Sequence, residues 1–245
     1  MIKPCVFLTL ILCLVPVNVV AGDLEDLLAR NATAYGGSEN WARIENVRYL
    51  LTIKEPSFEV TGTYVATRDG SMRIDIEADG QRVFSEGLHD GQAWQWTAGE
   101  GIALQDDKSA EALRHGIELP GRFFLLQDLH QRGEKVTLEG AVFEEDRRQW
   151  QVRVILEDGF IHDYFIDDAS ALIIRERDYR AFHPGVDSTR VTVETRKQEP
   201  LWIDGALSYR VNNNVNVDSG EWLATTRVRS IEHNIEIPEG YFLAD

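Results

Sequence analysis

Cysteine is scarce in this 245-residue chain, and both copies, Cys5 and Cys13, lie near the N-terminus. The surrounding stretch has the features of an export signal: Lys3 precedes an almost wholly apolar run from Val6 to Val20, and the small residue Ala21 follows it. We expect cleavage after Ala21. The remaining chain, residues 22–245, then has no disulfide, thiol nucleophile or cysteine metal site.

Export without disulfides favours the bacterial periplasm, because secreted eukaryotic domains are more often crosslinked. A mature chain of this length is long enough to be stabilised by its own core, and we expect one domain over residues 22–245. The alternative to cleavage is lipidation of Cys13. It is disfavoured because Leu12 stands where that processing requires a small residue.

An excess of basic residues is also missing. The chain has 41 Asp and Glu against 25 Lys and Arg, which gives a formal net charge of -16 at pH 7. Nucleic acids require a clustered basic face, so they are excluded as partners. The acidic excess is explained by solubility, and we expect a monomer.

Catalytic motifs are absent from the sequence. It has no Gly-x-Ser-x-Gly elbow, no phosphate-binding glycine loop, no dinucleotide fingerprint and no pair of histidines at helical spacing for zinc. We interpret His89, His162 and His183 as surface or packing residues, and expect no catalytic residue, no metal and no cofactor. A hydrolase built on two carboxylates remains an alternative, because such a pair needs no sequence signature.

Tight turns are abundant. Asp-Gly pairs at Asp69-Gly70, Asp79-Gly80 and Asp90-Gly91 separate short segments in which apolar and polar residues alternate. Asp-Gly favours two-residue hairpin turns, and alternation is typical of antiparallel strands with one buried face. Between Met72 and Ala78 the even-numbered side chains would therefore face the core, and Arg73 and its odd-numbered neighbours would face water.

The remaining pattern predicts the order of elements. Residues 24–35 form an amphipathic helix that Gly36-Gly37 ends, and strands begin at Val47. From Ala98 to Gly133 the alternation stops, which indicates a helical insertion with one helix from Asp107 to Gly116 and another starting at Pro120. Strands then resume to the end. We predict a mainly β (α+β) fold: a curled antiparallel sheet of about ten or more strands, forming an open half-barrel with an N-terminal helix and a helical lid.

Four stretches together resemble the LolA-like family of periplasmic lipoprotein carriers. They are the opening from Leu24 to Ile53, the strand from Leu88 to Trp96 that contains Asp90-Gly91 and Trp94, the lid segment that begins Leu119-Pro120-Gly121, and the closing stretch from Asn234 to Phe242. Gln92 and Trp96 replace a basic residue and a tyrosine of the relatives' strand. The likeness covers nearly the whole mature chain, and none of its motifs is catalytic.

This resemblance implies a noncatalytic periplasmic carrier that binds lipid or the acyl moiety of lipoproteins in an apolar cleft and delivers it toward the outer membrane, with a membrane complex as a possible partner. Exposing an acyl chain to water costs ~0.8 kcal/mol per methylene, so such a site needs an extensive apolar lining. The candidates for that lining are Tyr49, Leu51, Val60, Tyr64, Met72, Ile74, Ile76, Trp94 and Trp96 on strands and Phe123, Leu126 and Leu129 on the lid.

A recognition or sensory module that binds protein or glycan is the other alternative. The chain has six tryptophans, and an exposed cluster of them would form a stacking platform for a partner. Exposed aromatic side chains would favour recognition, and an enclosed apolar surface would favour carriage.

Overall fold

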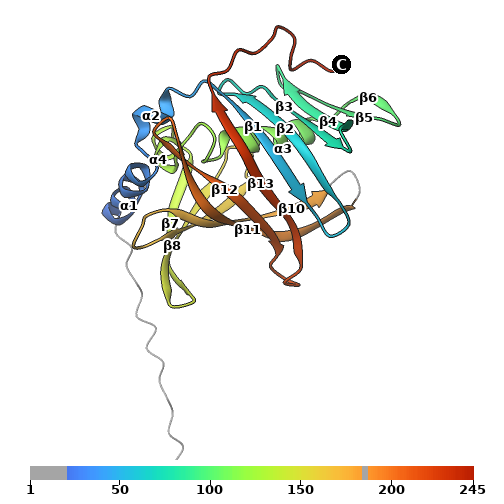
Figure 1. Ribbon diagram of the computed structural model, residues 1–245. Coiled ribbons are helices and arrows are strands. Elements are labelled where there is room, and N and C mark those ends of the chain that lie inside the picture. Colours follow the sequence, from blue (N-terminus) through green and yellow to red (C-terminus); the bar gives the residue numbers. More distant parts are fainter. Residues whose placement is uncertain (1–20, 184–186) are drawn as a thin grey trace, which may run out of the picture.

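The computed structural model describes residues 21–183 and 187–245 (Figure 1). Residues 1–20 of the expected signal peptide, with both cysteines, lie outside this range. None of the helices in the described residues combines the length and the apolar character of a membrane span. The helices are α1 (Ala21–Ala34), α2 (Ser38–Ala42), α3 (Asp107–Glu118) and α4 (Leu126–Gln131).

The strands form one 13-stranded sheet in the order β6-β5-β4-β3-β2-β1-β13-β12-β11-β10-β9-β8-β7. Neighbouring strands are antiparallel, and β1 pairs with β13, so the two halves of the chain join at the centre of the sheet. The strands are β1 (Asn46–Lys54), β2 (Glu59–Thr67), β3 (Met72–Ala78), β4 (Gln81–His89), β5 (Gln92–Thr97), β6 (Gly101–Leu104), β7 (Lys135–Glu144), β8 (Arg147–Ile155), β9 (Ile161–Asp167), β10 (Ile173–His183), β11 (Asp187–Ile203), β12 (Ala206–Asn216) and β13 (Trp222–His233).

The sheet curls, and the helical insertion lies inside the curl. In Figure 1, α3 lies behind β1 and β2, and it packs against β4 and β5. Helix α4 packs against α1 and β7. The prediction of a mainly β, open half-barrel with an N-terminal helix and a helical insertion is therefore confirmed.

Helix α1 and the closing stretch of the chain are fixed by polar contacts as well as by packing. Leu27, Leu28 and Tyr35 of the predicted apolar stripe are buried, and the Asn31 side-chain amide donates to the Ala171 carbonyl at 2.7 Å. At the other end, the Asn234 side-chain oxygen accepts a hydrogen bond from the Glu45 backbone amide at 2.8 Å. The segment that follows β13 is thereby tied to the start of β1.

Two of the three predicted Asp-Gly hairpin turns have the expected geometry. Asp79 and Gly80 have φ of 53° and 74°, and Asp90 and Gly91 have φ of 48° and 77°, as a type I′ turn requires. At Asp69-Gly70 only the glycine has positive φ, and the backbone amide of Thr67 donates to the Ser71 carbonyl across a longer turn.

The helical insertion differs from the prediction in three places. It contains the short edge strand β6, which has too few residues to show a clear alternation. Helix α3 has Asp106 as its N-cap, whose carboxylate accepts from the Ser109 amide, and the helix continues through Gly116. No helix starts at Pro120, because Gly121 has φ of 112°, which is not helical.

One face of β3 was expected to be solvated, and this expectation is wrong at Arg73. Arg73 is only 6% exposed because the C-terminal segment covers it. The guanidinium donates to the Tyr241 carbonyl at 3.2 Å and pairs with the Asp245 carboxylate at 2.7 Å. Both faces of this part of the sheet are therefore packed.

Candidate functional site

The concave face of the sheet is apolar where β1, β2 and β3 lie side by side. Tyr49 is paired with Tyr64, and Tyr64 with Ile74, so these three side chains share one face. The two tyrosine rings have centroids 6.0 Å apart. Seven of the predicted lining residues lie on this face. Four of them are buried, Tyr49, Leu51, Tyr64 and Met72, and three are half-buried, Val60, Ile74 and Ile76.

A short segment covers this face. We call residues 119–131, which comprise the loop after α3 and helix α4, the lid. The apolar side chains of the lid that enter the core, Phe123, Leu125, Leu126 and Leu129, are each 2% exposed or less. They belong to one buried cluster with Tyr49, Leu51, Tyr64 and Met72, to which α1, α2 and α3 also contribute, so the lid and the helices together fill the concave face.

Cationic side chains hold the lid in place. The guanidinium of Arg122, on the lid, lies over the Tyr64 ring at 4.4 Å and donates to the Gly116 carbonyl. Burial raises the pKa of Tyr49 to about 12, although the nearby Arg122 charge opposes this, so the tyrosine is neutral at physiological pH. The Asp128 carboxylate accepts from the Leu125 amide at 2.7 Å and thereby fixes the start of α4.

Arg68, from the end of β2, contacts the lid from the other side. Its guanidinium donates to the Ile44 carbonyl at 2.9 Å and to the Trp41 carbonyl, and it lies 5.7 Å and 5.1 Å from the ring centroids of Phe123 and Phe124. A hollow of about 320 Å³ opens here between α2 and α4. It is lined by Ser38, Ala42, Arg68, Phe124, Asp128, Gln131 and Arg132, and we call it the mouth hollow.

Trp94 and Trp96 lie on the opposite, convex face, although the sequence suggested that they share the apolar lining. The Trp94 indole donates to the Phe242 carbonyl at 2.8 Å, and the Arg82 guanidinium lies over Trp96 at 4.1 Å. The register explains the difference. The two-residue turn pairs Leu88 with Ala93 on the concave face and so places Trp94 opposite Gly87 on the convex face.

The concave face becomes polar at β9, β10 and β11, which the sequence analysis missed. His162 is 5% exposed, and its ring nitrogens lie 3.8 Å from a Glu176 oxygen and 3.7 Å from an Asp178 oxygen. Lys197 pairs with Glu176 at 3.1 Å. Burial alone would raise the pKa of Glu176, but the charges of Lys197 and His162 outweigh it and lower the pKa to about 2. This carboxylate is ionised at neutral pH and therefore cannot donate a proton as a catalytic acid.

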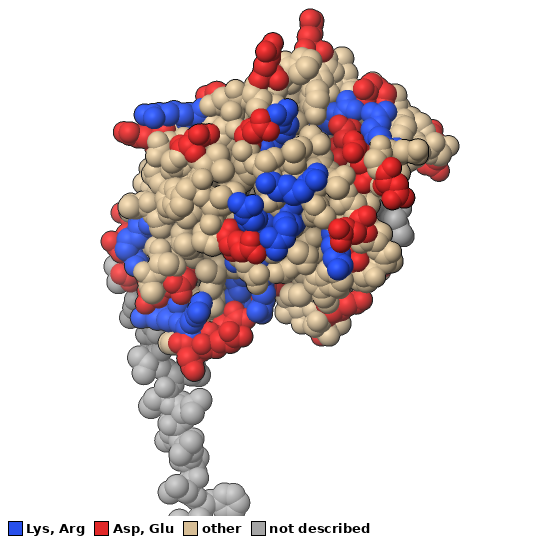
Figure 2. All heavy atoms as spheres, viewed as in Figure 1, with Lys and Arg blue, Asp and Glu red and all other residues tan. Residues whose placement is uncertain are grey.

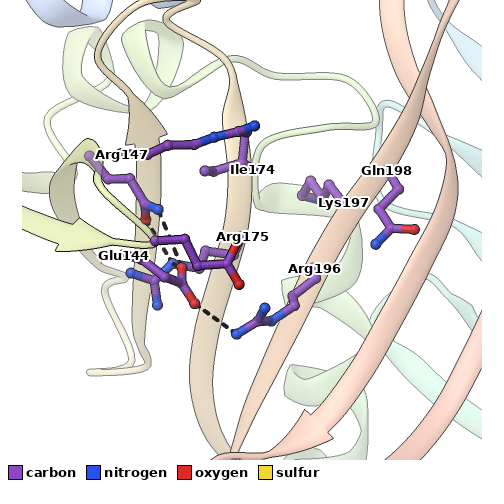
Figure 3. Close-up of a pocket in the computed structure, with 9 residues that line it drawn as sticks. Glu144, Arg147, Ile174, Arg175, Arg196, Lys197 and Gln198 are labelled. Carbon is purple, nitrogen blue, oxygen red and sulfur yellow. Dashed lines mark hydrogen bonds and ion pairs between the residues drawn. The ribbon is translucent and has the colours of Figure 1, made fainter.

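A second, smaller hollow of about 180 Å³ lies on the convex face (Figure 3). The buried Glu194 carboxylate accepts from Arg175 at 2.8 Å, Arg177 at 2.7 Å and Arg196 at 2.8 Å, and Glu144 bridges Arg175 and Arg196. Burial raises the pKa of Glu194, and the arginines lower it to a net value below the usual range. Most of the charge in this hollow is compensated internally.

Little of the described surface has the exposed aromatic side chains that a recognition module would use. Figure 2 shows acidic and basic side chains interspersed over the face that carries β11 to β13. Of the six tryptophans, all of which lie in the described residues, only Trp202 is largely exposed, at 55%. A stacking platform built from several tryptophans is therefore not present. Residues 21–183 and 187–245 also hold no group of three or more His, Cys, Asp or Glu side chains arranged for a metal ion.

Comparisons with known proteins identify the fold. No family model and no curated protein sequence matches this chain. Solved structures do match: a LolA superfamily protein from Nitrosomonas europaea has a TM-score of 0.55 at 9% identity and covers 89% of this chain and 96% of its own. A DUF1329 family protein from Desulfovibrio piger gives 0.54 at 9% identity, with coverage of 89% and 96%.

A third solved structure, described as an outer membrane lipoprotein-sorting protein domain, comes from Vibrio parahaemolyticus. Its TM-score is 0.55 at 8% identity, and the match covers 89% of this chain and 95% of that one. At these identities the likeness concerns the fold. The chain therefore has the LolA-like fold.

Proposed function

We propose that this chain is a noncatalytic periplasmic carrier that binds lipid, or the acyl moiety of lipoproteins, on the concave face of its sheet and passes it toward the outer membrane. The observation that carries the proposal is the way the concave face is covered. Helices and the lid, and not a second sheet, share one buried cluster with the apolar side chains of β1 to β3. Such a cover can be exchanged for a ligand without unfolding the sheet.

The energies of the two occupants are comparable. Burying a large apolar side chain stabilises by ~1.5–3 kcal/mol, so the four lid side chains contribute about 6–12 kcal/mol. A sixteen-carbon acyl chain has about fifteen methylenes at ~0.8 kcal/mol each, or about 12 kcal/mol. One acyl chain can therefore replace the lid side chains at little net cost, and the lid can return when the chain leaves.

Native mass spectrometry of the mature protein purified from its own periplasm, followed by organic extraction, tests this proposal directly. We expect a bound acyl-bearing species, or stoichiometric uptake of added lipid or lipopeptide. A clean apo mass with no uptake of either ligand contradicts the proposal.

A matched pair of variants locates the site. Ile76→Asp places a charge on the half-buried rim of the concave face, and Ile161→Asp makes the same change at an exposed position of β9. We expect the first variant to lose acyl uptake while keeping the β-sheet circular dichroism spectrum, and the second to retain both. Equal uptake by the two variants would place the ligand elsewhere.

A further inference from the structure

Two arginines meet at the mouth hollow, beside the lid aromatics that an acyl ligand would displace. Resting on the proposed function, we propose that Arg68 and Arg132 bind the anionic headgroup, a phosphate or carboxylate, of an acyl cargo in the mouth hollow. The acyl chain of the same ligand takes the place of Phe123 on the concave face. The preferred cargo is therefore an acidic amphiphile.

The position of Arg68 is fixed before any ligand arrives. Its side chain is half-buried and is held by the carbonyls of Trp41 and Ile44, which are neutral acceptors. Arg68 forms no close ion pair among the described residues. Burial lowers its pKa, and the more distant carboxylates of Glu45 and Asp128 oppose that shift. A partly desolvated cation without a directly paired carboxylate is a favourable place for an incoming anion.

Arg132 completes the arrangement from the C-terminal end of α4. Its guanidinium lies 4.1 Å from the centroid of the Phe124 ring, while Arg68 lies 5.1 Å from the same ring. Phe124 is therefore contacted by both cations and lines the hollow. The one carboxylate in the lining, Asp128, already accepts a hydrogen bond from the Leu125 amide. The hollow carries a net positive charge on a chain whose formal net charge is -16.

The lid couples the two halves of the ligand. Arg68 contacts both Phe123 and Phe124, so withdrawal of the lid removes the aromatic faces that now interact with its charge. An anion that enters the hollow restores an electrostatic partner at the moment when the acyl chain restores the apolar contact. A neutral acyl ligand supplies only the second of these interactions.

A pair of ligands that differ by one phosphate tests the inference. We would measure binding of 1-palmitoyl lysophosphatidic acid and of 1-palmitoyl glycerol, with inorganic phosphate as a third probe, by isothermal titration below the critical micelle concentrations. We expect the phosphate-bearing ligand to bind about tenfold or more tightly than the neutral one, since hydrogen bonds to an ionised group are about twice as strong as neutral ones. Salt should reduce the difference.

The arginine variants assign the effect. Arg132 is exposed, so Arg132→Gln should reduce the preference for the anionic ligand without unfolding the protein. Arg68→Gln should reduce it further, and Arg68→Lys should retain part of it. Arg147→Gln removes the same charge from the convex-face hollow and serves as the control.

The outcomes separate this inference from the proposed function. Equal binding of the two acyl ligands in the parent and in Arg132→Gln overturns the headgroup site and leaves the carrier intact. Inorganic phosphate that competes as well as the lysolipid shows a free-anion site and also overturns it. Failure of both acyl ligands to bind overturns the carrier itself, and an effect of Arg147→Gln alone places the anion on the convex face.

Discussion

Phe123→Ala separates the lid's contribution to stability from its effect on ligand binding. Phe123 is fully buried against the concave face, so its truncation should destabilise the protein by ~3–5 kcal/mol, as for other buried phenylalanines. If the lid competes with an acyl ligand for the same space, the variant should bind that ligand more tightly. A loss of about 2 kcal/mol of transfer free energy from the competing side chain corresponds to a gain of roughly 30-fold in affinity.

Phe165→Ala is the matched control for this experiment. Phe165 is equally buried but lies on the convex face, with the Arg175 guanidinium 3.8 Å from its ring centroid. We would measure urea unfolding without ligand, and affinity from the displacement of a fluorescent fatty acid. Both variants should lose stability, and only Phe123→Ala should gain affinity. An unchanged or lower affinity in Phe123→Ala, or an equal gain in both variants, would refute competition between lid and ligand.

Three further predictions concern single residues. In Gly87→Ala the new Cβ would lie 2.5 Å from the Trp94 indole, so we expect a loss of ~1–3 kcal/mol and a shift of tryptophan emission as the indole is displaced. Burial raises the pKa of Glu86, so the ionised carboxylate destabilises the fold at pH 7. Glu86→Gln should therefore raise the free energy of urea unfolding at pH 7, and this gain should shrink at pH 4, where the carboxyl group is largely protonated. The pKa of Glu176 is about 2 in the fold, against ~4.3 in an unfolded chain. The ionised carboxylate therefore stabilises the fold above pH ~4.3 by on the order of 3 kcal/mol, and this stabilisation should be lost as the pH falls toward ~2. Lys197→Gln should make that acid loss shallower, and an unchanged pH profile would contradict the assignment.

The sequence predicted the architecture because alternation and turn chemistry are local signals. The strand from Asn46 to Lys54 and the turns at Asp79-Gly80 and Asp90-Gly91 are set by neighbouring residues, and the structure has them where expected. The amphipathic stripe of α1 is equally local. Strand β6 was missed because four residues at the edge of a sheet give too short a pattern.

The candidate site was harder to predict because it depends on register and on distant segments. Trp94 was assigned to the wrong face, yet the two-residue turn at Asp90-Gly91 already fixed its position opposite Gly87, and a glycine is the residue that leaves room for an indole. The cover over Arg73 could not be seen from β3, since Tyr241 and Asp245 lie far along the chain. The placement of Arg68 beside the lid likewise depends on tertiary contacts.

The chemistry of the concave face limits where an acyl chain can lie. Near β9 to β11 this face carries His162, Glu176 and Lys197, and an acyl chain packed there would separate charges from their partners or leave them desolvated. Near β1 to β3 it carries tyrosines and aliphatic side chains, most of which share one buried cluster with the lid. The part at β1 to β3 is therefore better suited to the chain than the part near Glu176 and Lys197. The mouth hollow lies beside it because Arg68 follows β2 directly. Strand β2 therefore ends beside the mouth hollow. A headgroup would have to be held there if its acyl chain lay on the concave face beneath the lid.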